Sequence, residues 1–490
     1  MGTAQRRLIL SLLVCGAAYL LLLIPDRDAP PATARALLHF NWNRDSAWYR
    51  LEARFKAIRS AGCDPSRPAV TRQLQRDDRL LRALQLPVSP QAPVLDTIEL
   101  EVFDLGPVVA GCPQWVPQYT QLVTSVRTVV KRQSEHWDMT ARISRDRLYR
   151  LLWGGRTALE EVMLQGRPDS IPALTVETDE PSQTPSTRIL GVTIHSGDLL
   201  VSRGGEPSSA LIAVGSDYPG NFSHDAMVYV DPRTSLASVV ESNFDHGVNV
   251  LTLEDYLRDV KLRVMVLRLR ADLPALQHDP MLPHEAASFA LRVARGRHIP
   301  YDFQIDYEDH TRMYCSELVA TSYQPVGITL WRQMSQISDS GTRRWLTELG
   351  VTHFETEEPS DLEYDPQLRV VAEWRDPETL FRDHVDNVVT EAMLRRADAG
   401  DHLRYDWYLL PVSRILKLYS LAVQALGFRG PVPPGMSATT ALRMSAYNRR
   451  HERLRDVVLE RAARFQQREG YRAPEWELLR FALQASVETG

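Results

Sequence analysis

The sequence has little cysteine, no low-complexity tract and no large excess of charge of either sign. Its 490 residues include 4 Cys, and 57 Lys and Arg stand against 62 Asp and Glu, which gives a net charge of −5. Because no segment interleaves basic with aromatic residues, we expect no nucleic-acid-binding domain and no nucleic-acid partner. A chain of this length exceeds one ordinary hydrophobic core and predicts several domains.

Metal and cofactor motifs are also missing. The chain has no His-Glu-x-x-His, no Cys-x-x-Cys and no Gly-Lys motif that could cradle a phosphate. His278 and the pair His284-Glu285 flank a Pro-rich turn, where a metal site is the weaker alternative. We therefore predict no metal site and no cofactor.

An apolar segment runs from Leu8 to Ile24 and directly follows Arg6 and Arg7. Roughly 17 apolar residues are just long enough to cross a bilayer, and a positive flank stays on the cytoplasmic side. We therefore expect residues 1–28 to form a transmembrane anchor that holds the rest of the chain outside the cytoplasm. A signal peptide cleaved among the small residues around Ala34 is the alternative.

The cysteines are unevenly placed, since Cys15 lies inside this apolar segment. The other three, Cys63, Cys112 and Cys315, would then face a compartment in which disulfides form. We expect a bridge between Cys63 and Cys112, which share the N-terminal region, and this leaves Cys315 as the free thiol. Three reduced, buried cysteines are the alternative.

The remaining pattern divides the chain into four regions. Residues 35–166 carry apolar residues at helical spacing, clearest over 115–133 and 143–164, and residues 167–188 form a polar linker. Residues 189–330 mix short strands with helices and predict an α+β domain. The expected strands are 189–194, 198–202, 226–230, 236–241 and 262–269, and the expected helices are 283–296 and 315–323.

Residues 331–490 are mostly helical, after a strand at 368–374. Long helical patterns cover 378–396, 405–426, 438–467 and 474–486. The second of these is strongly apolar, but Arg414 and Lys417 lie in its middle, which is costly inside a bilayer. We interpret it as a buried bundle helix, with a membrane-surface helix as the alternative.

His224 and Glu241 are the first two candidate catalytic residues. His224 stands just before one expected strand, and Glu241 ends the next. If residue 230 closes on 235 or 236, residue 224 pairs with 241 or 242, so the two side chains lie opposite each other or one step apart. A carboxylate at that distance can hold an imidazole and fix its tautomer. A structural His and a solvated Glu are the ordinary alternative.

Cys315 is the third candidate. It lies in the first turn of the helix expected over 315–323, where the positive end of the helix dipole lowers a thiol pKa. A thiolate, a general base and an orienting acid are the minimal equipment for acyl transfer through a thioester. An inert, buried cysteine is the alternative.

These residues belong to an ordered set of short motifs. In chain order they are Gly197-Asp198-Leu-Leu, Ser223-His224-x-x-Met-Val-Tyr, Val-Glu241-Ser, Pro300-Tyr301-Asp302-Phe303 and Tyr314-Cys315-Ser-Glu-Leu-Val. The set resembles the YiiX-like permuted papain-like cysteine amidases of the NlpC-type superfamily, which also holds relatives of lecithin–retinol acyltransferase. The resemblance covers about residues 189–325.

The resemblance implies a circularly permuted papain-like (NlpC-like) fold flanked by N- and C-terminal helical regions. It also implies a catalytic triad of Cys315, His224 and Glu241. We expect Tyr301, Asp302 and Tyr314 to line the substrate cleft, and a surface turn is the alternative for Tyr301 and Asp302.

The expected activity is hydrolysis of an amide or ester bond by an extracytoplasmic, membrane-anchored cysteine hydrolase. Its expected substrate is a cell-wall (peptidoglycan) peptide, with a lipid acyl hydrolase or acyltransferase as the alternative. A catalytically inactive envelope scaffold is the hypothesis from a different class of protein.

Overall fold

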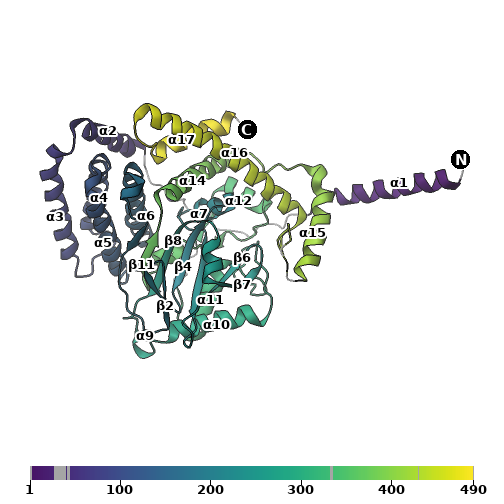
Figure 1. The fold of residues 1–490 in the computed structure, drawn as a ribbon, viewed down its shortest axis with the longest axis horizontal. Helices are drawn as coiled ribbons and strands as arrows, with labels where there is room; N and C mark the ends of the chain where they lie inside the picture. The colour runs from purple at the N-terminus through teal and green to yellow at the C-terminus, as the bar shows by residue number, and fades with distance from the viewer. Residues whose placement is uncertain are drawn as a thin grey trace.

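The computed structural model describes residues 3–26, 40, 45–330, 335–426, 428 and 430–488. A central antiparallel sheet is flanked by one helical region from the N-terminal part of the chain and another from the C-terminal part (Figure 1). The small residues around Ala34, where cleavage was the alternative expectation, lie outside the described residues.

The N-terminal helical region is a bundle. Its helices are α2 (Asp45–Ala61), α3 (Arg67–Ala83), α4 (Pro93–Gly111), α5 (Val116–Ser134) and α6 (Arg142–Gln165). The predicted helices 115–133 and 143–164 coincide with α5 and α6 to within a few residues. Cys63 and Cys112 form a disulfide with a Cα–Cα distance of 5.6 Å, and it ties the end of α2 to the end of α4.

Helix α1 (Thr3–Leu22) projects from the body of the molecule beside α15 (Figure 1). Leu12, Leu13 and Leu20 of this helix are each more than 60% exposed. No helix in the part of the chain that the structure describes is long and apolar enough to cross a membrane. The expected transmembrane role of residues 1–28 is therefore not supported.

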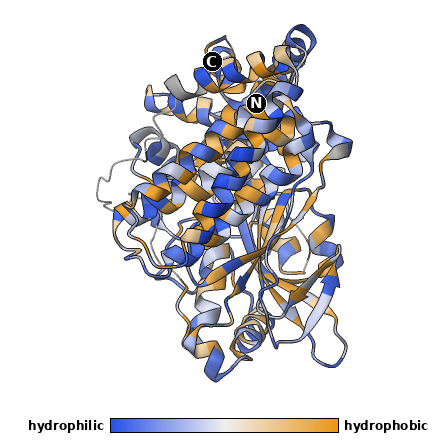
Figure 2. Cartoon of the chain, turned by 90° about the vertical axis from the view of Figure 1, so that its left-hand side faces the viewer, coloured by the Kyte–Doolittle hydropathy of each residue, from blue (hydrophilic) through white to orange (hydrophobic). Residues whose placement is uncertain are grey.

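The central sheet has seven strands in the order β1-β11-β8-β4-β5-β6-β7, and every neighbouring pair is antiparallel. Figure 2 shows strands that are largely hydrophobic, behind helices that carry both hydrophobic and hydrophilic residues. The strands are β1 (Leu174–Val176), β4 (Leu199–Gly204), β5 (His224–Val230), β6 (Ala237–Asn243), β7 (Gly247–Thr252), β8 (Lys261–Leu269) and β11 (Leu368–Trp374).

Different elements cover the two faces of this sheet. One face packs on α10 (Leu282–Gly296) and α11 (Cys315–Tyr323), through a core that includes Met227 and Val240. The opposite face packs on α8 (Leu253–Arg258) and on the small hairpin of β2 (Ser186–Ile189) and β3 (Val192–His195). Because side chains alternate along a strand, residue parity in β5 and β6 decides which face a side chain reaches.

Three sequence predictions differ from the observed elements. The single strand expected over 189–194 is a hairpin, because Leu190 (φ 45°) and Gly191 (φ 90°) make a tight turn between β2 and β3. The segment expected to be a linker contributes β1, which pairs with β11 at one edge of the sheet. Strand β11 lies beyond residue 330, so the sheet extends past the expected end of the α+β domain.

Shorter elements complete the sheet domain, and four longer helices form the C-terminal region. The shorter ones are α7 (Pro207–Val214), α9 (Pro274–His278), α12 (Ser340–Glu348), α13 (Asp361–Tyr364), β9 (Ser335–Gln336) and β10 (Glu355–Thr356). The longer ones are α14 (Pro377–Asp398), α15 (Leu410–Gln424), α16 (Ala438–Glu469) and α17 (Glu475–Glu488).

Helix α15 is not the buried bundle helix that its apolar sequence predicts. Ile415 is 60% exposed and Leu418 is 68% exposed, whereas its buried residues include Leu410 and Ser413. Val412 and Tyr419 are also more than half exposed, and the helix contacts α16 and α1.

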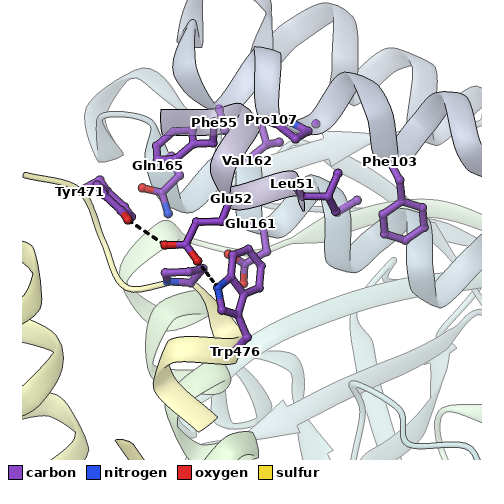
Figure 3. Close-up of a pocket in the computed structure, with 14 residues that line it drawn as sticks. Leu51, Glu52, Phe55, Phe103, Pro107, Glu161, Val162, Gln165, Tyr471 and Trp476 are labelled. Atoms are coloured by element: carbon purple, nitrogen blue, oxygen red, sulfur yellow. Dashed lines mark hydrogen bonds between the residues drawn. The ribbon is translucent and has the colours of Figure 1, made fainter. Parts of the chain in front are cut away.

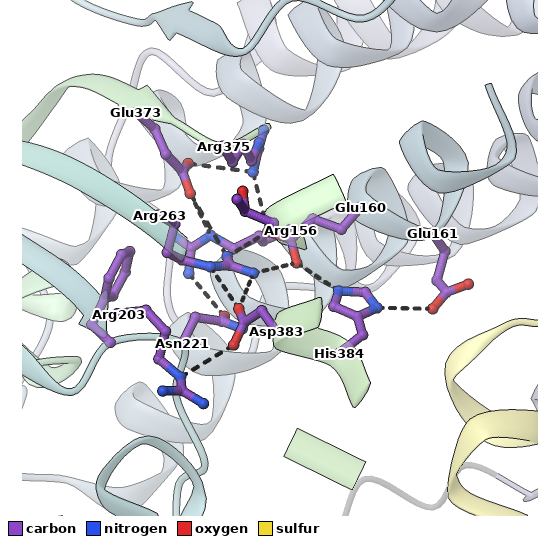
Figure 4. Close-up of polar contacts among 12 residues, drawn as sticks. Arg156, Glu160, Glu161, Arg203, Asn221, Arg263, Glu373, Arg375, Asp383 and His384 are labelled. Atoms are coloured by element: carbon purple, nitrogen blue, oxygen red, sulfur yellow. Dashed lines mark hydrogen bonds and ion pairs between the residues drawn. The ribbon is translucent and has the colours of Figure 1, made fainter. Parts of the chain in front are cut away.

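Polar contacts join the two helical regions and the sheet. Tyr471 and Trp476, near the C-terminus, donate hydrogen bonds of 2.9 and 2.7 Å to the Glu52 carboxylate of α2 (Figure 3). Arg263 of β8 is fully buried and donates to Glu160 of α6 (2.6 Å) and Asp383 of α14 (2.9 Å) (Figure 4). Buried charges require partners of this kind, so the three regions are held together at their centre.

Candidate active site

His224 and Glu241 meet on neighbouring strands. Val230 pairs with Ala237, so Glu241 stands opposite Ala226 and reaches His224 on the diagonal, two residues away. The register differs from the predicted one because the turn over 231–236 is longer than the loop we assumed. A two-residue offset keeps both side chains on the same face, and Nε2 of His224 lies 2.7 Å from Oε2 of Glu241.

Glu241 holds this imidazole with a carboxylate that is ionised near neutral pH. Burial alone would raise its pKa, but the charge of His224 and hydrogen bonds from His224 and Asn243 lower the pKa to about 2. The Asn243 amide donates to Oε1 of Glu241 at 2.6 Å, so both carboxylate oxygens are engaged. With Nε2 of His224 bound to Glu241, the imidazole offers Nδ1 as its other basic atom.

Cys315 is the first residue of α11. Tyr314 before it is extended (φ −91°, ψ 176°), and its carbonyl accepts the first helical hydrogen bond, from Leu318 N–H at 3.2 Å. The approach to the helix is fixed on β6, where Ser242 Oγ donates to the Met313 carbonyl at 2.6 Å. The thiol therefore stands at the positive end of a helix dipole, as the sequence predicts.

Asp225, which the sequence analysis missed, lies beside the thiol. It is fully buried, and neither carboxylate oxygen makes a well-formed hydrogen bond. Burial raises the pKa of Asp225 to about 6, although the charge of His224 and weaker contacts with Cys315 and Ser316 lower it. Burial and the Asp225 charge raise the pKa of the Cys315 thiol well above its ordinary value. In this arrangement the thiol is protonated. Strand alternation is the sequence signal that could have identified Asp225, because the residue after His224 in a strand points to the sheet face opposite to that of His224.

The thiol and the imidazole lie on opposite faces of the sheet. Cys315 and Asp225 are on the face covered by α11, whereas Glu241 and His224 share the face of Tyr256 in α8. Among the described residues no hydrogen bond joins Cys315 to His224. The structure thus brings together two of the three predicted catalytic residues and leaves Cys315 apart, and the catalytic assignment itself stays a prediction.

The three residues expected to line the substrate cleft share a pocket with the thiol, and their role in substrate binding stays a prediction. Tyr301, Asp302 and Tyr314 line one pocket with Cys315. Asp302 is fully buried and accepts the backbone N–H groups of Gln304 (3.0 Å) and Asp306 (2.6 Å), so it also shapes the loop that it begins. His224 is not among the residues that line this pocket.

The part of the chain that the structure describes contains no group of three or more His, Cys, Asp and Glu residues placed to hold a metal ion. His284, which the sequence analysis weighed as a weak metal candidate, bonds through Nδ1 to Ser196 Oγ at 2.8 Å and stacks on Tyr229.

One family of known proteins matches the sheet domain. Residues 193–372 match the family model of the permuted papain-like amidase enzymes, YaeF/YiiX, C92 family. The crystal structure of the metalloprotein YiiX from Escherichia coli O157:H7 is similar with 20% identity and a TM-score of 0.30, over 37% of this chain and 97% of that one. No curated protein matches the chain. The family match supports a cysteine hydrolase or amidase, and residues 193–372 are a permuted papain-like domain of the YaeF/YiiX family, with helical regions on both sides.

Proposed function

We propose that the protein is a cysteine hydrolase that cleaves an amide or ester bond, with Cys315 as nucleophile, His224 as base and Glu241 as the residue that orients the base. The observation that carries the proposal is the 2.7 Å contact between Nε2 of His224 and the buried Glu241 carboxylate. It leaves Nδ1 to accept a proton, inside a domain whose family is defined by amidase chemistry.

The reaction follows from these roles. Nδ1 of His224 takes the proton of the Cys315 thiol, and the sulfur attacks the carbonyl carbon of the substrate. Backbone N–H groups in the first turn of α11 are placed to stabilise the oxyanion. The leaving amine or alcohol receives the proton, a thioester remains on Cys315, and water activated by His224 releases the acid.

Catalysis requires the imidazole and the thiol to meet on one face. His224 is the first residue of β5 and its side chain is 19% exposed, so less packing restrains it than restrains the residues that follow it in the strand. For Glu241 to orient the imidazole during this step, the thiol must reach Nδ1 of His224 while Nε2 keeps its contact with Glu241.

We propose an extracytoplasmic location, because the Cys63–Cys112 bridge is typical of an oxidising compartment. Two substrate classes are compatible with that location, a cell-wall peptide and a lipid acyl group.

The test is hydrolysis of cell-wall peptide fragments and of phospholipids by the full chain. Cys315→Ala should lose turnover of whichever class is hydrolysed, and Cys15→Ser, which removes the exposed thiol, is the matched control. Equal turnover by wild type and Cys315→Ala would contradict the proposal.

A second candidate function is a catalytically inactive envelope scaffold. It is favoured by the buried, protonated thiol and by its separation from His224. This candidate predicts that iodoacetamide modifies Cys15 and leaves Cys315 unmodified near neutral pH, and that Cys315→Ala has no cellular phenotype. Alkylation of Cys315 that depends on His224 would contradict it.

A further inference from the structure

The outward side of helix α15 is apolar and its inward side is polar. Val412, Ile415 and Tyr419 lie on the outward side at helical spacing and are each more than half exposed. Ser413 and Lys417 lie on the inward side, where they donate hydrogen bonds to backbone carbonyls at the start of α16 (2.9 Å) and in the segment before it (3.2 Å). A surface helix of a soluble domain has the reverse arrangement, with its apolar stripe toward the core. The outward side of α15 therefore calls for an apolar cover.

More exposed apolar surface adjoins α15. The helix follows η5 (Trp407–Leu409), in which Trp407 is 63% exposed and Tyr408 is 52% exposed. Helix α1 leaves the body beside α15, where Tyr19 of α1 donates a hydrogen bond of 3.2 Å to the Tyr408 carbonyl (Figure 1). Because Leu13 and Leu20 of α1 are exposed as well, one extended apolar partner could cover both helices.

A pocket of about 580 Å³ with a mainly basic lining lies close in the chain to the start of α15. Its arginines come from α14, from the segment before η5 and from α16, and they are Arg396, Arg404, Arg449, Arg450 and Arg453. Asp401 and Asp406 also line the pocket and pair with three of these arginines at 2.8 to 3.9 Å. Among the residues that the structure describes, no carboxylate pairs with Arg404 or Arg453. Both are exposed, so the pocket presents cationic charge to an anion in solvent.

An anionic lipid bilayer matches all of these features. Its acyl region would cover the outward side of α15 and the exposed residues of α1, and its interface is the environment in which Trp and Tyr are enriched. Its phosphates would meet the arginines. A second copy of the chain fits less well, because a two-fold contact through this surface would bring the arginine pockets of both copies together, and like charges repel.

We propose that α15 lies flat on an anionic lipid bilayer, with its outward side among the acyl chains and with lipid phosphates in the arginine pocket. In this orientation α15 occupies the interface and does not cross the bilayer. The surface would hold the sheet domain beside the bilayer whatever substrate is cleaved, so the proposal does not depend on catalysis by Cys315.

The test places an environment-sensitive NBD fluorophore on α15 of the full chain, at Ile415→Cys. Cys15→Ser and Cys315→Ala remove the two free thiols, and Cys63 and Cys112 are bridged, so only the introduced cysteine is labelled. Vesicles of phosphatidylcholine with about 30% phosphatidylglycerol should raise the emission several-fold, because the fluorophore enters the acyl region. The same label at Leu86→Cys is the control, because Leu86 is 77% exposed and follows α3, which lies at the other end of the molecule (Figure 1).

The arginine pocket is tested by Arg404→Gln with Arg453→Gln. Each arginine near an anionic surface strengthens binding about fivefold, so the pair of substitutions should weaken vesicle binding about 25-fold. Arg72→Gln with Arg79→Gln is the matched control, because both residues are exposed on α3 and the net charge changes equally.

Each other outcome overturns the proposal. Vesicle binding without a change in emission at residue 415 would show that α15 stays outside the bilayer. Equal binding to vesicles of phosphatidylcholine alone, or equal weakening by the two pairs of arginine substitutions, would exclude the arginine pocket as a headgroup site. A rise in emission without vesicles that follows protein concentration would show that a second copy covers α15.

Discussion

The two faces of the central sheet differ in what covers them and in what chemistry they hold. The face of α11 is closed by several helices and contains the thiol, Asp225 and the buried charges around Arg263. The face of α8 is covered by one short helix and a hairpin, and it holds His224 and Glu241 at a partly open edge. Cys315 therefore lies where the packing is deep, whereas His224 and Glu241 lie where fewer elements cover the sheet.

The largest expected effect is on the closed face. Arg263→Ala removes the shared partner of Glu160 and Asp383 and leaves two buried carboxylates short of charge compensation, so unfolding should become easier by about 3–5 kcal/mol. Urea denaturation measures this change. Arg258→Ala in α8 breaks exposed ion pairs to Glu254 and Asp255 and should change stability by less than about 1 kcal/mol. Equal effects of the two variants would show that the faces do not differ in this way.

On the open face, Glu241 should make stability depend on pH. Its folded pKa of about 2 lies below the ordinary 4.5, so its contribution is fully present above pH 4.5 and is lost as pH falls toward 2. The stability advantage of wild type over Glu241→Gln should shrink by about 3 kcal/mol across that window. Glu254→Gln, at an exposed carboxylate of α8, should show no such loss. A constant difference between wild type and Glu241→Gln would mean that the carboxylate is not held in its ionised form.

The same variant should impair catalysis. A neutral amide in place of the carboxylate cannot stabilise a protonated imidazole, so Glu241→Gln is expected to lower kcat about 10²-fold on any substrate that the enzyme hydrolyses. Steady-state kinetics with Glu254→Gln as control gives this comparison. If kcat stayed within twofold of wild type, the pair on the open face would have a structural role only.

Much of the local structure could be predicted from the sequence. The helix 315–323 has the same bounds in prediction and structure, because Tyr314 before it is extended and the expected stripe of Leu318, Val319 and Ser322 is buried, as is nearly all of the helix. Strand β7 was missed, since its Asn249 and its partly exposed residues hide the apolar alternation.

The arrangement of the site was harder to predict than its residues. His224 and Glu241 were expected to meet and do meet, because a shift of two residues in register keeps a side chain on the same face. The face itself depends on strand parity and on where α11 docks, and both are set by contacts distant in sequence. For the same reason the sequence does not reveal Asp225 as the neighbour of the thiol.

The smallest expected effect concerns Asp225 and the reactivity of the Cys315 thiol on the closed face. Asp225→Asn removes the negative charge beside Cys315, so the thiol pKa should fall and alkylation by iodoacetamide near pH 7 should become about tenfold faster. Rates are measured by mass spectrometry in a Cys15→Ser background. Asp231→Asn, in the exposed turn after β5, is the control and should leave the rate unchanged. A slower or unchanged rate in Asp225→Asn would exclude Asp225 as the cause of the raised thiol pKa.

The most direct test of the central claim is to trap the thioester. Full-length Cys15→Ser protein is mixed with a p-nitrophenyl acyl ester, quenched in acid within seconds and examined by intact mass and peptide mapping. A nucleophilic Cys315 predicts the mass of one acyl group on the peptide that contains residue 315, and its absence from Cys315→Ala. An unmodified Cys315 alongside ester turnover, or an acyl group on another residue, would contradict the account.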